Sequence, residues 1–133
     1  MHDVPTSTAL RQLADLGQDP DPLRWHWAIA RLEPTGRLVL PAEARTALGA
    51  TTGQPTPVRG VCNRVALVLR ASGAGTAIAV DGRGRLRLPT WLRRANHRSG
   101  SLLVGTRRGS PLVVIAPAGV LDGPGGMVTG ESR

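Results

Sequence analysis

The sequence lacks most of the residues that build aromatic cores, disulfides and metal sites. Phenylalanine and tyrosine are absent from its 133 residues, three tryptophans are its only aromatic residues, and Cys62 is its only cysteine. A core must therefore come from valine, leucine, isoleucine and alanine, which suits closely packed β-strands. One cysteine excludes an intrachain disulfide framework and is typical of a reducing cytoplasm, and the three scattered histidines lack the spacing of zinc ligands.

Acidic residues and long apolar runs are also scarce. Only nine acids occur, three of them between residues 31 and 108, and none forms a close pair suited to acid–base catalysis. The glycine-rich stretches 73–75 and 82–85 lack the third glycine or the lysine of phosphate-binding loops. No apolar run reaches membrane-spanning length, and the acidic N-terminus does not resemble a signal peptide. We therefore expect a cytoplasmic protein that is not an enzyme and needs no cofactor, metal or membrane.

Lysine is missing as well, so all 17 basic residues are arginine. Fourteen of them lie between residues 31 and 108 beside three acids, a net charge of +11, whereas residues 1–24 have a net charge of −2 and residues 109–133 of −1. The basic charge thus belongs to the central part of the chain. This distribution indicates a folded surface for a polyanion such as nucleic acid, and the alternative is a merely solvated basic surface.

A motif present twice organises this central part. Gly36-Arg37-Leu38-Val39-Leu40-Pro41 returns 48 residues later as Gly84-Arg85-Leu86-Arg87-Leu88-Pro89. Both copies have an acid three residues before the glycine, and both have an arginine four residues after the proline. Alternating residues predict a strand, a turn precedes it, and the proline ends it and suits the first turn of a helix. Two further strands follow in each copy, at 57–61 and 64–69 and at 101–106 and 112–116.

The sequence therefore predicts a mainly β fold with short helices, built from two ββαββ repeats. The expected organisation is an N-terminal extension, 1–24, with a short helix over 7–16, a first repeat, 25–70, a linker, 71–75, a second repeat, 76–117, and a disordered tail, 118–133. Within the first strand, Trp25, Trp27 and Ile29 share a face, which predicts a stripe in the core or at a subunit interface.

The pattern acid-x-x-Gly-Arg-hydrophobic-x-hydrophobic-Pro-x-x-x-Arg resembles the DNA-binding domain of the AbrB/MazE/SpoVT family, and its tandem occurrence is most similar to the MraZ branch. The resemblance covers residues 25–117. It implies a pseudo-symmetric swapped-hairpin β-barrel in which the two repeats interleave, and a bacterial transcriptional regulator. The Asp-x-x-x-Arg element typical of MraZ is present at Asp81 and Arg85, whereas the first repeat has Glu33 in place of the aspartate.

Candidate DNA-binding residues come from two arguments. Residues two apart along a strand share a face, so Arg83, Arg85 and Arg87 should project together from the second hairpin and grip phosphate or guanine. The resemblance implies DNA contacts for the motif arginine and for arginines of the short helix. These positions are Arg37 and Arg45 in the first repeat and Arg85, Arg93 and Arg94 in the second.

Each candidate has a structural alternative. Arg45 and Arg93 stand at equal spacing from an acid and could instead be internal partners of Glu33 and Asp81. The expected function is sequence-specific binding of double-stranded DNA by a nucleoid-associated regulator that forms a homo-oligomer. One alternative is an antitoxin that binds both its own promoter and a toxin, and another is a structural or protein-interaction module that does not bind DNA.

Overall fold

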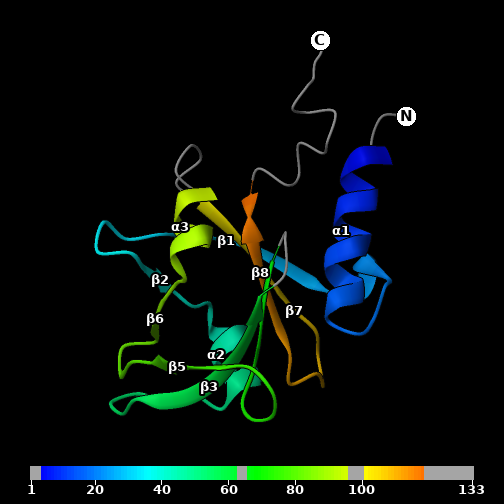
Figure 1. Ribbon diagram of the computed structural model, residues 1–133. Coiled ribbons are helices and arrows are strands. Elements are labelled where there is room, and N and C mark those ends of the chain that lie inside the picture. Colours follow the sequence, from blue (N-terminus) through cyan, green and yellow to red (C-terminus); the bar gives the residue numbers. More distant parts are fainter. Residues whose placement is uncertain (1–3, 63–65, 96–100, 119–133) are drawn as a thin grey trace.

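The computed structural model describes residues 4–62, 66–95 and 101–118 (Figure 1). Eight antiparallel strands form one sheet in the order β1-β7-β8-β4-β3-β5-β6-β2. A bridge between Leu32 and Leu38 brings the end of β1 next to β2, so the sheet curls into a nearly closed barrel. The predicted mainly β barrel with short helices is confirmed.

Each repeat supplies two strands, a short helix and two more strands. The first repeat contains β1 (His26–Arg31), β2 (Arg37–Val39), α2 (Ala42–Leu48), β3 (Thr56–Cys62) and β4 (Leu67–Arg70). The second repeat contains β5 (Thr76–Val80), β6 (Arg85–Arg87), α3 (Thr90–Ala95), β7 (Ser101–Thr106) and β8 (Val113–Pro117). The strand expected over 64–69 is β4, which begins at Leu67; residues 64 and 65 lie outside the described residues.

The two repeats exchange strands within the single chain. Strand β1 of the first repeat pairs with β7 of the second, and β5 of the second repeat pairs with β3 of the first. The remaining strand pairings between the repeats are β2–β6 and β4–β8. Swapping the repeats reproduces the same cyclic strand order, so the barrel has a pseudo-twofold axis through these two pairs.

The duplicated motif forms equivalent turns. The N–H of Glu33 donates to the carbonyl of Arg37 at 2.8 Å, and the N–H of Asp81 donates to the carbonyl of Arg85 at 2.9 Å. Beyond each turn the chain crosses to the other repeat, where the N–H of Leu40 donates to the carbonyl of Gly84 at 3.0 Å. The motif thus joins the two repeats at one end of the axis.

A mainly aliphatic core fills the barrel, as the scarcity of aromatic residues predicts. Leu38 and Leu86, the central residues of the paired β2 and β6, are both 0% exposed. Leucines from both short helices, Leu48 and Leu92, join the same cluster. Since burying one such side chain contributes about 1.5–3 kcal/mol, these paired positions hold the two repeats together.

A second apolar cluster lies on the outer surface of the barrel. Helix α1 (Val4–Leu16) packs there through Leu13 and Ala14, against β8 and neighbouring strands. Trp25 and Trp27 stack with ring centroids 5.6 Å apart and belong to this cluster, with the 3-10 helix Pro22–Arg24 just before them. Ile29 does not join them, because it is 60% exposed. Figure 1 shows α1 on the side of the barrel away from β2 and β6.

Candidate nucleic-acid interface

The outer face of the β2–β6 pair brings motif arginines together. Leu38 and Leu86 point inward, so the residues on either side of them point outward. In the antiparallel register Arg37 lies opposite Arg87, and Val39 lies opposite Arg85. A two-stranded ribbon with three outward arginines therefore forms at the pseudo-twofold axis.

Two acids, one from each repeat, hold Arg85. Its Nε lies 3.3 Å from Asp81 Oδ2, and its Nη1 lies 3.3 Å from Glu33 Oε1. Arg37 approaches the same Asp81 carboxylate, with Nη1 3.9 Å from Oδ2. The Arg85 side chain is only 22% exposed, and its contact with Glu33 joins the repeats. Arg85 is therefore a positioned cation rather than a freely solvated one.

The Asp81 carboxylate also organises its own turn. Its Oδ1 accepts hydrogen bonds from the backbone N–H groups of Arg83 and Arg85, both at 2.9 Å. The hydrogen bond from the Arg85 N–H, supported by that from Arg83 and by the Arg85 guanidinium, holds the pKa of Asp81 below its ordinary value despite partial desolvation. Asp81 is therefore ionised at neutral pH and fixes the direction in which Arg83 and Arg85 leave the turn.

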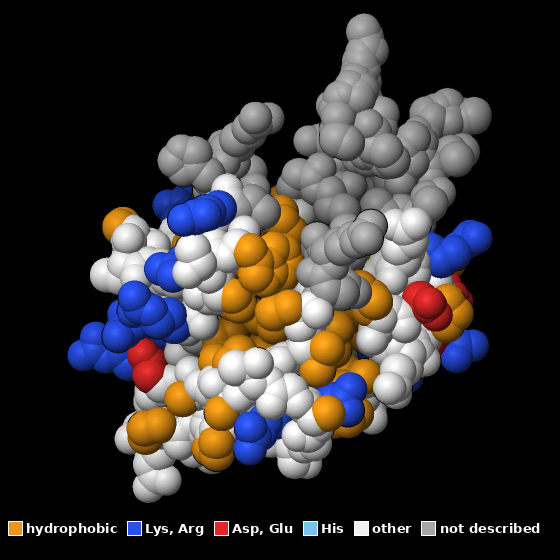
Figure 2. Space-filling model, viewed as in Figure 1, with side chains coloured by type: hydrophobic (Ala, Val, Ile, Leu, Met, Phe, Trp, Pro, Cys, Tyr) orange, Lys and Arg blue, Asp and Glu red, His pale blue; other side chains and the backbone are white. Residues whose placement is uncertain are grey.

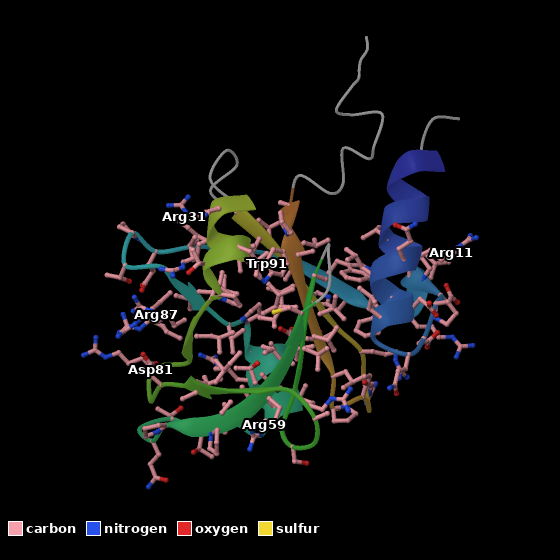
Figure 3. The ribbon with its side chains drawn as sticks, in the orientation of Figure 1. Arg11, Arg31, Arg59, Asp81, Arg87 and Trp91 are labelled. Carbon is pink, nitrogen blue, oxygen red and sulfur yellow. The ribbon has the colours of Figure 1, made fainter. Side chains whose placement is uncertain are left out.

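Arg83, Arg87 and Arg94 are the exposed members of the predicted set. Arg83 lies in the turn between β5 and β6, Arg87 ends β6, and Arg94 lies in the last turn of α3. Within the described residues, none of these three side chains forms an ion pair. Figure 3 shows Arg87 and Asp81 on the side of the molecule opposite Arg11 of α1.

Arg45 and Arg93 lie on the turns of the opposite repeat. A methyl group at Gly84 would lie 2.7 Å from Arg45 Cδ, and one at Gly36 would lie 2.9 Å from Arg93 Nη1. The alternative that these arginines pair with Glu33 and Asp81 is wrong among the described residues, because Arg85 and Arg37 contact those acids instead. Because Gly36 and Gly84 have no side chains, Arg93 and Arg45 can approach the ribbon closely.

A small polar cavity of about 150 Å³ opens beside the ribbon. The residues that line it include Arg45, Arg83, Thr51 and Thr52. The loop between α2 and β3, which contains both threonines, is held in place by the N–H of Gly53, which donates to the carbonyl of Gly82 at 2.8 Å. Two guanidinium groups beside threonines suit an anion of phosphate size. The threonines were missed in the sequence, because they lie in a loop that only folding brings to the second hairpin.

We call this surface the arginine face and define it by the seven predicted residues Arg37, Arg45, Arg83, Arg85, Arg87, Arg93 and Arg94. The acids beside it are Glu33 and Asp81, so the face has a net charge of +5. Figure 2 shows a cluster of basic side chains with an acidic one beside it on the β2–β6 side of the molecule. The structure thus places six of the seven residues on the β2–β6 pair or at its turns, and Arg94 on the last turn of α3, which follows β6.

No protein-family model, curated protein or solved structure matches this chain significantly. The AbrB/MazE/SpoVT resemblance therefore stays a prediction. Among the described residues, no helix is long and apolar enough to cross a membrane. In the same part of the chain, no three His, Cys, Asp or Glu side chains lie together as metal ligands would.

Proposed function

We propose that the protein is a sequence-specific DNA-binding transcriptional regulator that contacts double-stranded DNA through the arginine face. The observation that supports this most is the convergence of seven arginines from both repeats on one exposed two-stranded ribbon and its flanking helices. A two-stranded ribbon fits the major groove of B-DNA, and guanidinium groups bind guanine edges and phosphates bidentately. A cytoplasmic, nucleoid-associated location and homo-oligomer formation belong to the same proposal.

The residues of the face divide between two roles. Arg83, Arg87 and Arg94 are exposed and reach phosphates or base edges. Arg85 is held by acids from both repeats and aims a fixed guanidinium outward, which lowers the entropy lost on binding. The cavity between Arg45 and Arg83 accepts one backbone phosphate and sets the register of the ribbon.

The pseudo-twofold axis through the ribbon predicts the form of the DNA site. Equivalent groups on either side of such an axis meet the two strands of DNA in related ways, which favours an imperfect palindrome. The halves of the ribbon are unequal because Val39 stands where the second repeat has Arg87. We therefore expect one half-site to be more sensitive to base changes than the other.

The test compares two charge-matched double variants. Arg83→Gln with Arg87→Gln removes two charges from the arginine face, and Arg11→Gln with Arg59→Gln removes two exposed charges from α1 and β3. Binding to the DNA upstream of the protein's own gene and to an unrelated fragment is titrated across salt. We expect the first pair to lower specific affinity at least about tenfold and to flatten the log–log salt slope by roughly 1–2, with little change for the second pair.

Two outcomes would contradict the proposal. Equal losses from both double variants would mean that the arginine face has no special part in binding. Weak binding without preference for the protein's own upstream DNA would mean that the arginines serve solvation or another partner, since specific complexes exceed non-specific ones by about 10³ or more.

A further inference from the structure

A second cavity, of about 500 Å³, lies between strands β3 and β5 and the segment that joins β6 to α3. Eight of its nine described lining residues are uncharged, and Arg87 is the ninth. Figure 2 shows hydrophobic side chains gathered in a hollow near the centre of the view. The cavity therefore has a mainly apolar lining, and its volume is typical of small-molecule binding sites.

The cavity lies along one of the two weakly paired seams of the barrel; the other joins β1 to β2 through the single bridge between Leu32 and Leu38. Strands β5 and β6 are paired only at Val80 and Leu86, so they separate toward Ala77 and Leu88. At the equivalent end of the other repeat, the seven-residue helix α2 packs against β7, whereas the six-residue helix α3 packs mainly against β8. The pseudo-symmetry is therefore broken at the place where the cavity opens.

A glycine shapes the floor of the cavity. Gly60 on β3 pairs with Thr76, and Val104 on β7 pairs with Ala28. Gly60 and Val104 therefore occupy equivalent positions in the two repeats. Val104 is buried in the core, but a methyl group at Gly60 would lie 2.7 Å from Ile78 Cδ1. The missing side chain lets Ile78 lie flat on β3, which leaves the space above it open.

We propose that this cavity binds a small apolar carboxylic acid. Arg87 is the one charged side chain among the described lining residues, and it is exposed without an ion pair in the part of the chain that the structure describes. A hydrocarbon tail would bury itself against Ile78, Leu88 and Pro89, while the carboxylate would pair with the guanidinium at the rim. A single orienting charge beside an apolar space selects a ligand that is amphipathic and anionic.

Such a ligand would regulate DNA binding, a consequence that rests on the proposed function. Arg87 belongs both to the cavity and to the arginine face, so a carboxylate bound to it competes with a phosphate or a base. Ligand and DNA would then weaken one another's binding by the same factor, as linkage requires.

Cys62 makes the cavity directly testable without DNA. It is the only cysteine of the chain and lines the cavity, so the rate at which iodoacetamide alkylates it reports occupancy. We expect sodium octanoate to bind with one-to-one stoichiometry in calorimetry and to slow alkylation at least about fivefold at saturation. Octanamide, which has the same tail without the charge, should bind about tenfold more weakly.

Three variants test whether octanoate binds in this cavity and whether Arg87 binds its carboxylate. Ala79→Leu fills the cavity from an exposed strand position and should abolish both octanoate binding and protection of Cys62, whereas Ala42→Leu, at the exposed start of α2, should change neither. Arg87→Gln should remove the preference for octanoate over octanamide. Absence of saturable octanoate binding, or binding and protection that persist in Ala79→Leu, would overturn the proposal. Because these measurements contain no DNA, their failure is distinct from failure of the proposed function.

Discussion

Among single residues, Asp81 connects more of the arginine face than any other side chain. Its two oxygens accept from the backbone of Arg83 and Arg85 and contact the guanidinium groups of Arg85 and Arg37. Among the described residues, the side chain of Glu33, at the equivalent position, contacts only the Arg85 guanidinium. The shorter aspartate side chain reaches its own turn, as aspartates in turns commonly do.

Asp81→Glu should therefore destabilise the protein by about 1 kcal/mol, because the longer carboxylate cannot accept both turn N–H groups in the same way. Asp81→Asn keeps an accepting oxygen and is the matched variant. Urea unfolding at neutral pH measures both. Equal stability of Asp81→Glu and the parent protein would contradict this account of the turn.

The lowered pKa of Asp81 also predicts acid sensitivity. A carboxyl group whose pKa is lower when folded stabilises the fold fully above its unfolded pKa, about 3.9, and loses that contribution as the pH falls below this value toward the lowered pKa. The loss of stability below about pH 4 should be smaller in Asp81→Asn than in the parent protein. Urea unfolding from pH 6 down to pH 2.5 measures it, and identical pH profiles would exclude the effect.

Gly84 leaves room for Arg45, and the effect of this contact on stability can be measured separately from the effect of backbone strain. Gly84 and Gly49 both have positive φ, +79° and +71°, but only at Gly84 would a methyl group meet another residue. Substitution by alanine should cost about 1 kcal/mol at either site and more at Gly84. Adding Arg45→Ala should recover part of the loss at Gly84 and none at Gly49, as a double-mutant cycle by urea unfolding would show.

Among the larger elements, α1 stabilises the barrel from the side away from the arginine face. Leu13 is 1% exposed and packs in the outer apolar cluster. Leu13→Ala should lower the free energy of unfolding by about 2–4 kcal/mol. Because Figure 1 places α1 opposite β2 and β6, DNA affinity at a temperature where the variant is folded should stay within about twofold. A large loss of DNA affinity in the folded variant would instead place α1 in the interface.

For the whole molecule, strand exchange makes the two repeats one folding unit. Strand β1 lies between the second repeat's β7 and the bridge to β2, and β5 lies between β3 and β6. A protease site placed within residues 71–75, which are exposed, should therefore allow cleavage without separation of the halves. The cleaved halves should elute together in size-exclusion chromatography and part only in denaturant. Separate elution in native buffer would mean that each repeat folds alone.

The duplicated motif, the alternation of residues around Leu38 and Leu86 and the absence of phenylalanine and tyrosine were enough to predict the mainly β fold. These features are local, because alternation places each residue on one face and glycine or proline ends each element. Alternation around the buried leucine of the second hairpin also predicted that Arg85 and Arg87 point outward, whereas Arg37, Arg45, Arg93 and Arg94 came from the family resemblance. Their role in binding DNA stays a prediction.

Contacts between distant segments depended on the tertiary structure. Spacing alone suggested that Arg45 and Arg93 pair with Glu33 and Asp81, but strand exchange places each helix arginine over the turn of the other repeat. The packing of Trp25, which is buried, and of Trp27, which is partly buried, in the cluster with α1 also depends on where the N-terminal segment meets the barrel, and Ile29 stays exposed. A sequence determines which face a side chain takes along its own strand, whereas its partners depend on how strands far apart in the chain come together, which no local pattern encodes.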